Sequence, residues 1–250
     1  MHPVLARYLD SDLTRELLRR VDAGEEIGPE HRHLAEIARE WSEERREILA
    51  APEHLPPLAQ SALLFLATHA ALRASREDPL LGPEIAQAEE ALHARGAAPG
   101  EAEALFAQLM AEEAFGSEDD PESFDAEWIR EGLRDLPELL ALDEPRVRAL
   151  LDEFAARVPA AAMPHHAQAA RLLLEAAWAE GIAPINVEHV EDALKGLERA
   201  FGRAEFPRAA RALQAFVAFL HERGLMGRLR AERLGRTAGL AAMLTPSSDA

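Results

Sequence analysis

Apolar side chains recur every three or four positions along nearly the whole of this chain, and proline or glycine interrupts the pattern at intervals. This spacing places apolar residues on one face of an α-helix, whereas a half-buried β-strand needs them at every second position. The chain also lacks runs of alternating β-branched residues. The sequence therefore predicts an all-α fold of about 11–12 helices with no sheet.

Residues 1–116 are predicted to form an N-terminal helical bundle. Residues 58–75 are apolar almost all round, which is typical of a helix covered on several sides, so we expect this helix at the centre of the bundle. The other helices are expected around it: one ending at Gly24, one from Pro29 through Trp41 to the Pro56–Pro57 pair, and two over residues 83–95 and 101–115.

An acidic segment follows the bundle. Residues 112–127 contain eight carboxylates and no cation, with glycine, serine and proline between them. This composition predicts a solvated linker over residues 117–127 and a second domain over residues 128–250. A calcium loop is the alternative, but the alternating ligand spacing of an EF-hand is missing.

The second domain is predicted to be an array of paired helices. Residues 143–181 and 186–224 share a capped first helix, a proline near the start of the second helix and a terminal glycine. Their 43-residue interval lies in the range of HEAT- and armadillo-type repeats, so we expect stacked αα-hairpins. No third copy occurs, and two hairpins of equal length that share caps by chance remain the alternative. A last helix is expected over residues 228–244, with a frayed end at residues 245–248.

Composition disfavours elaborate catalysis. Cysteine is absent, and Ser, Thr, Tyr, Asn and Lys together supply only 15 residues. Neither a G-x-S-x-G motif nor a glycine-rich phosphate loop occurs. We therefore expect no cofactor and a protein that is not an enzyme, although a site built from Asp, Glu, His and Arg stays open.

Metal-ligand spacing occurs in two places. Glu-x-x-His, which di-metal helical bundles use, appears as Glu30–His33 and as Glu90–His93. His165 and His166 are adjacent at a predicted helix start, where neighbouring side chains point about 100° apart. With 45 acidic residues and 10 histidines such pairs arise by chance, so solvated or capping histidines are the favoured interpretation.

Charge divides the chain unevenly. The formal net charge is −18, yet residues 195–236 carry 10 cations against four carboxylates and the remainder sums to −24. A basic segment of this kind could bind a partner, or its arginines could pair with nearby carboxylates. The candidate partner-binding residues are Arg208, Arg211, Arg223, Arg228, Arg230 and Arg233.

These observations favour a cytoplasmic adaptor or regulator that binds another protein through a helical groove, for example along the alanine-rich residues 167–179. The first residues do not resemble a signal peptide, and the longest apolar stretch, residues 61–71, is shorter than the ~20 residues of a membrane span. We therefore expect no membrane partner. The alternatives are a nucleic-acid-associated regulator that uses the arginine-rich region and a metal-dependent helical-bundle enzyme.

Overall fold

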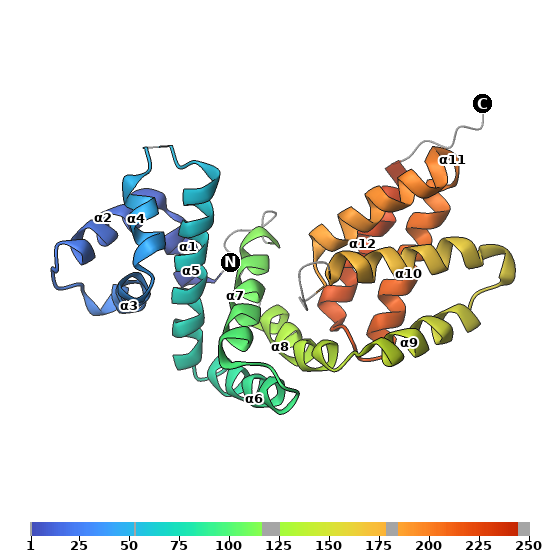
Figure 1. Cartoon of the computed structure of the whole chain (residues 1–250), viewed down its shortest axis with the longest axis horizontal. Helices are drawn as coiled ribbons and strands as arrows, with labels where there is room; N and C mark the ends of the chain where they lie inside the picture. The colour runs from blue at the N-terminus through green and yellow to red at the C-terminus, as the bar shows by residue number, and fades with distance from the viewer. Residues whose placement is uncertain (1, 53, 117–125, 179–184, 245–250) are drawn as a thin grey trace. The chain divides into compact units, whose positions relative to one another are not determined.

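The computed structural model describes residues 2–52, 54–116, 126–178 and 185–244 (Figure 1). Within these ranges the chain forms twelve α-helices and two short 3-10 helices and contains no strand, which confirms the predicted all-α fold. The chain divides into two compact units. The N-terminal unit comprises residues 1–93 and 97–130, and the C-terminal unit comprises residues 94–96 and 131–250.

The predicted acidic linker cannot be followed as a whole. Residues 117–125 lie outside the described residues, and the last two residues of the predicted linker, Ala126 and Glu127, begin helix α8. The boundary between the two units falls within α8, at Arg130. The domain limits at residues 116 and 128 stay a prediction.

The N-terminal unit is built around one long helix. Its elements are α1 (Pro3–Leu9), α2 (Ser11–Asp22), η1 (Pro29–His31), α3 (Arg32–Glu40), α4 (Ser42–Ala50), α5 (Pro57–Glu77), α6 (Leu81–Ala94) and α7 (Pro99–Gly116). As its composition predicted, α5 is central and contacts α1, α3, α4 and α7 (Figure 1). Its buried side chains include Leu63, Leu66 and Ala70, which pack into a core with Leu18 and Ile37.

The single helix predicted from Pro29 onwards is wrong, because the chain breaks at Trp41 into α3 and α4. Trp41 has a non-helical backbone (φ −103°, ψ 69°), although its N–H still donates to the carbonyl of Ile37. The Arg45 guanidinium donates to the Ala38 carbonyl at 2.9 Å and pairs with Asp22 at 3.3 Å. A side chain thus satisfies one carbonyl that the break leaves without a helical partner.

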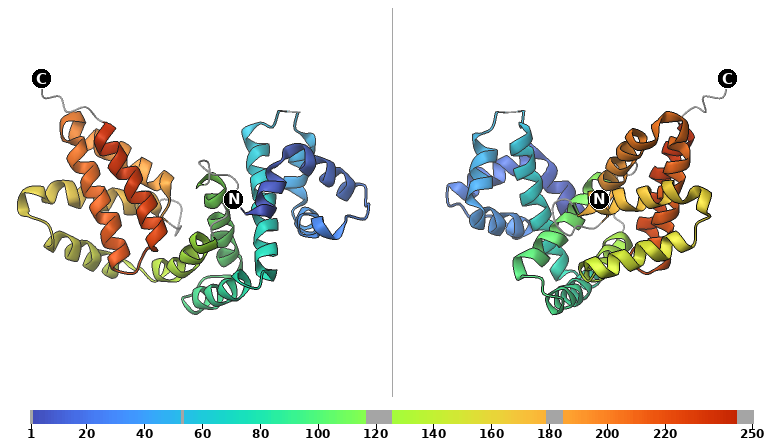
Figure 2. Two further views of the ribbon diagram at one scale, coloured as in Figure 1. Left: turned by 180° about the vertical axis from the view of Figure 1, so that it is seen from behind. Right: turned by 45° about the vertical axis from the view of Figure 1, so that its right-hand side comes forward.

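The C-terminal unit contains most of α8 (Ala126–Leu140), then α9 (Glu144–Ala156), η2 (Ala160–Ala162), α10 (Met163–Ala177), α11 (Val187–Glu222) and α12 (Arg228–Leu244). Helix α11 contacts both α10 and α12, and Figure 2 shows α12 beside the second half of α11. The core between these helices contains Phe154, Leu173, Leu197 and Phe216. Within this unit the apolar faces expected from sequence are therefore buried against one another.

Helix α11 is two helices joined at a kink. Gly202 has φ 69° and ψ 171°, a conformation that L-residues other than glycine rarely adopt. The predicted caps are confirmed, because the Asp143 side chain accepts from Arg146 N–H and the Asn186 side chain accepts from His189 N–H. The two parts of α11, before and after Gly202, therefore form a second pair of consecutive helices, which follows the pair α9 and α10.

Candidate functional site

In the described residues, neither Glu-x-x-His pair is joined by a third metal-ligating side chain. Within the part of the chain that the structure describes, no three His, Asp or Glu side chains converge as metal ligands. Glu30 lies in η1, and His33 in α3 places its Nε2 3.5 Å from a carboxylate oxygen of Glu77. Glu90 and His93 are both exposed on α6.

Most of the candidate partner-binding arginines are engaged within the protein. Arg208 pairs with Glu205 at 3.1 Å, Arg223 with Glu153 at 3.1 Å and Arg228 with Glu232 at 2.7 Å. The other three are Arg211, which is exposed, Arg233, which is half-buried, and Arg230, which is buried.

Arg230 was predicted to lie on the partner-binding surface, and this prediction is wrong, because only 2% of the residue is exposed. Its guanidinium donates to the Ile185 carbonyl at 3.0 Å and lies 4.0 Å from Asp135 in α8. Asp135 accepts from the Gly227 N–H at 2.8 Å, and Glu131 accepts from the Leu229 N–H at 2.7 Å. Burial raises the pKa of Asp135 to about 6. Arg230 thus connects α12 to α8 and is not a surface group.

One cavity is lined both by candidate metal-binding histidines and by candidate partner-binding arginines. A pocket of about 400 Å³ in the C-terminal unit is lined by His165 and His166 of α10 and by Arg208 and Arg211 of α11. Glu205 lies 3.1 Å from His165 Nε2 and 3.1 Å from the Arg208 guanidinium. Glu205 does not line the pocket, but its carboxylate contacts two of the four basic side chains that do.

The larger cavity is an apolar groove in the N-terminal unit, between α5 and α7, with a volume of about 490 Å³. We call it the α5–α7 groove. One wall is a helical stripe on α5, formed by Ser61, Leu64, Phe65, Thr68 and His69. The opposite wall is a stripe on α7, formed by Gly100, Glu103, Ala104, Ala107, Gln108 and Ala111.

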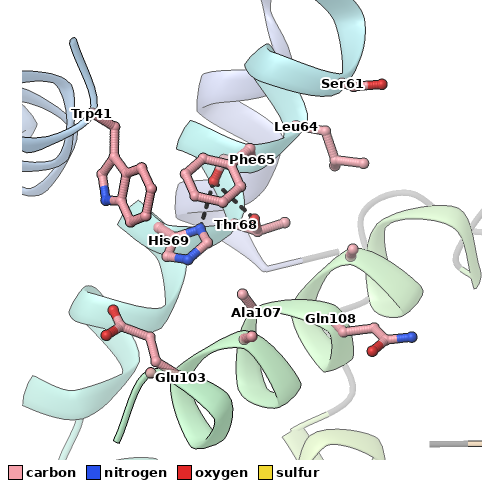
Figure 3. Close-up of a pocket in the computed structure, with 12 residues that line it drawn as sticks. Trp41, Ser61, Leu64, Phe65, Thr68, His69, Glu103, Ala107 and Gln108 are labelled. Carbon is pink, nitrogen blue, oxygen red and sulfur yellow. Dashed lines mark hydrogen bonds between the residues drawn. The ribbon is translucent and has the colours of Figure 1, made fainter. Parts of the chain in front are cut away.

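Trp41 closes one end of the α5–α7 groove (Figure 3). Its ring meets Phe65 edge-to-face, with centroids 4.8 Å apart and planes at 71°. The His69 ring lies 4.0 Å from Phe65 and 6.1 Å from Trp41. Trp41 is 42% exposed and His69 is 6% exposed, so the indole is the most accessible ring of this aromatic cluster.

The hydrogen bonds on the α5 wall run within that helix. The Ser61 hydroxyl donates to the Pro57 carbonyl at 3.1 Å, and the Thr68 hydroxyl donates to the Phe65 carbonyl at 3.0 Å. His69 Nδ1 lies 2.9 Å from the same Phe65 carbonyl (Figure 3). On the α7 wall, Glu103 forms no ion pair or hydrogen bond with any described residue.

Sequence reasoning missed this groove. It placed Trp41 on the inward face of one continuous helix, and it described residues 58–75 as covered on several sides without identifying the side that stays open. The available signal was the small residues at helical spacing on α7, opposite an apolar helix with two bulky residues, Leu64 and Phe65. In the stretch 167–179, where we expected a groove, Ala169, Ala170 and Ala177 lie in the core. Other residues of this stretch (Arg171, Leu174, Glu175 and Trp178) line a cavity of about 390 Å³ together with Val147 and Leu151 of α9, so the expected groove stays a prediction.

No family model, curated protein or solved structure matches this chain. None of the described helices has the length and apolar character needed to cross a lipid bilayer.

Proposed function

We propose that the protein binds a partner protein and that the α5–α7 groove receives an amphipathic helix of that partner. The observation that carries this proposal is an open apolar groove of about 490 Å³ with a tryptophan 42% exposed at its end. A concave, mostly apolar site with a few polar groups is the usual form of a binding site. The groove lies between two helices, which is the setting of helix-in-groove recognition.

The dimensions of the groove suit a helix. From Gly100 to Ala111 its α7 wall extends over about 16 Å, or three helical turns. A helix with apolar residues at positions i, i+4, i+7 and i+11 covers about the same distance. The short side chains of Ala104, Ala107 and Ala111 let a third helix approach α7 closely.

Charge specifies the partner further. The N-terminal unit carries 28 Asp and Glu residues against 11 Arg residues, a formal net charge of −17. The C-terminal unit carries 17 carboxylates against 16 cations, a net charge of −1. Almost all of the net negative charge of the protein is thus on the unit that contains the groove. A basic helix is attracted to this unit and an acidic helix is repelled.

Two probe peptides test the proposal on the full chain. Each is an amphipathic helix of about 18 residues with the same leucine face, and the polar face is lysine in one and glutamate in the other. We expect the Leu/Lys peptide to bind with a dissociation constant in the range of about 1–10 μM and the Leu/Glu peptide to bind at least about tenfold more weakly. Isothermal titration calorimetry at two salt concentrations measures both constants.

A pair of matched variants locates the binding site. Ala104→Arg places a long side chain in the groove from an exposed position on α7, and we expect it to abolish binding. Ala86→Arg makes the same change at an exposed position on α6 outside the groove, and we expect binding to be unchanged. Equal binding of both peptides, or wild-type binding by Ala104→Arg, would contradict the proposal.

A further inference from the structure

The α5 wall of the α5–α7 groove offers hydrogen-bond acceptors, because its two hydroxyl donors are already used. The Ser61 and Thr68 hydroxyls each donate to a carbonyl of their own helix, at 3.1 and 3.0 Å. Each oxygen still has acceptor capacity but no second proton to donate. A ligand group that must accept a hydrogen bond therefore gains nothing from these two side chains.

In its neutral form, His69 is also an acceptor toward the groove. Its Nδ1 lies 2.9 Å from the carbonyl of Phe65, which can only accept, so Nδ1 carries the proton of the neutral ring. Nε2 then bears the lone pair. Figure 3 shows this second nitrogen on the side of the ring that faces α7. His69 lines the groove and is 6% exposed.

Glu103 adds a negative charge opposite these acceptors. It lines the groove from α7, is half-buried, and has no ion-pair or hydrogen-bond partner among the described residues. In Figure 3 its carboxylate extends from α7 toward the side where Trp41 and His69 lie. A purely apolar side chain in this end of the groove would desolvate the carboxylate and His69 Nε2 without replacing their hydrogen bonds.

On the basis of the proposed function, we infer that the residue of the partner helix that enters the Trp41 end is an arginine. Its guanidinium supplies donors for Glu103 and His69 Nε2, and its planar face can stack on the exposed indole ring of Trp41. Its aliphatic stem covers the apolar wall. Glu103, His69 and Trp41 are then the residues that determine specificity for this anchor.

Three peptides test the inference on the full chain. They are Leu/Lys helices that differ at one central anchor position, which is arginine, citrulline or leucine. Citrulline keeps the stem and most donors of arginine but carries no charge. We expect the arginine peptide to bind about tenfold more tightly than the citrulline and leucine peptides.

Glu103→Gln supplies the second readout. We expect this variant to remove the preference for arginine over citrulline and to weaken the leucine peptide no more than a control does. The control is Glu90→Gln, which removes the same charge from an exposed position on α6 outside the groove and should preserve the preference.

The outcomes separate the two proposals. If none of the three peptides binds, the proposed function fails. If they bind and the leucine anchor equals or exceeds arginine, or Glu103→Gln keeps the arginine preference, the groove binds a helix but the arginine inference is wrong.

Discussion

Trp41 shows how one backbone break changes the role of a side chain. In an unbroken helix its position would turn the indole toward the core, but the break between α3 and α4 leaves it 42% exposed at the end of the α5–α7 groove. Arg230 shows the opposite case, since a side chain expected on the surface is 2% exposed. Each residue type alone suggested the wrong environment, because neighbouring elements decided it.

Trp41→Ala should separate binding from stability. We expect the free energy of unfolding to fall by only about 1 kcal/mol, since the indole is partly solvated, while the Leu/Lys peptide loses most of its affinity. Leu66→Ala, at a fully buried position of α5, should instead cost about 2–5 kcal/mol. Urea unfolding and calorimetry measure both quantities. A loss for Trp41→Ala as large as that for Leu66→Ala would show that the indole belongs to the core.

Arg230→Ala should destabilise the protein by about 3 kcal/mol, because it leaves the buried Asp135 and the Ile185 carbonyl without the guanidinium. Arg236→Ala, an exposed position on the same helix, should change stability by less than about 0.5 kcal/mol. Urea unfolding of the two variants checks this difference. Equal stability would mean that Arg230 does not hold α12 to α8.

At the scale of the helix, local sequence predicted most of what forms. The apolar stripes, the Asp143 and Asn186 caps and the central position of α5 all follow from residue spacing and side-chain chemistry. The break at Trp41 could not be predicted, because no glycine or proline marks it and the stabilising Arg45–Ala38 bond is visible only in the folded chain. The groove depends on that break and on the packing of α5 against α7, so it could not be predicted from the sequence either.

Two glycines with different backbones allow a test of the α11 kink. Gly202→Ala should cost about 1–3 kcal/mol because of φ 69° alone, since no atom lies within 4 Å of the added Cβ. Gly235→Ala, within α12, meets only Gln214 at 3.9 Å and should stabilise the helix by up to about 1 kcal/mol. Thermal unfolding compares them. Destabilisation of the two variants by the same amount would contradict the assignment of a strained backbone to Gly202.

At the scale of the whole molecule, we expect one buried group in each unit to change stability with pH, and the two changes have opposite directions. In the N-terminal unit, His2 Nδ1 accepts from Val4 N–H at 3.2 Å, and its Nε2 lies 3.1 Å from the Ser75 hydroxyl, which donates to Ala71. Burial lowers the pKa of His2 from 6.5 to about 4. Its contribution to stability is therefore complete above about pH 6.5 and is lost as the pH falls toward 4.

The pKa of Asp135, in the C-terminal unit, is shifted in the opposite direction to that of His2. Its pKa is raised from 3.8 to about 6, mainly by burial, so its contribution to stability is complete below about pH 4 and is lost as the pH rises through 6. Acidification from pH 7 to pH 5 should therefore loosen α1 and tighten the contact between α8 and α12. Hydrogen exchange, corrected for the intrinsic rate at each pH, measures both segments in one sample. His2→Asn should abolish the response of α1 alone, and a shift of both segments in the same direction would contradict this account.

The exposed indole at the end of the α5–α7 groove also makes the protein its own optical reporter. Trp128 is 8% exposed and Trp178 is half-buried, so the long-wavelength part of the fluorescence should come mainly from Trp41. Any molecule that fills the groove displaces water from that ring and moves its emission to shorter wavelength, whatever its own chemistry. Binding of a partner in the groove can thus be detected without a label, as a blue shift of the tryptophan emission maximum.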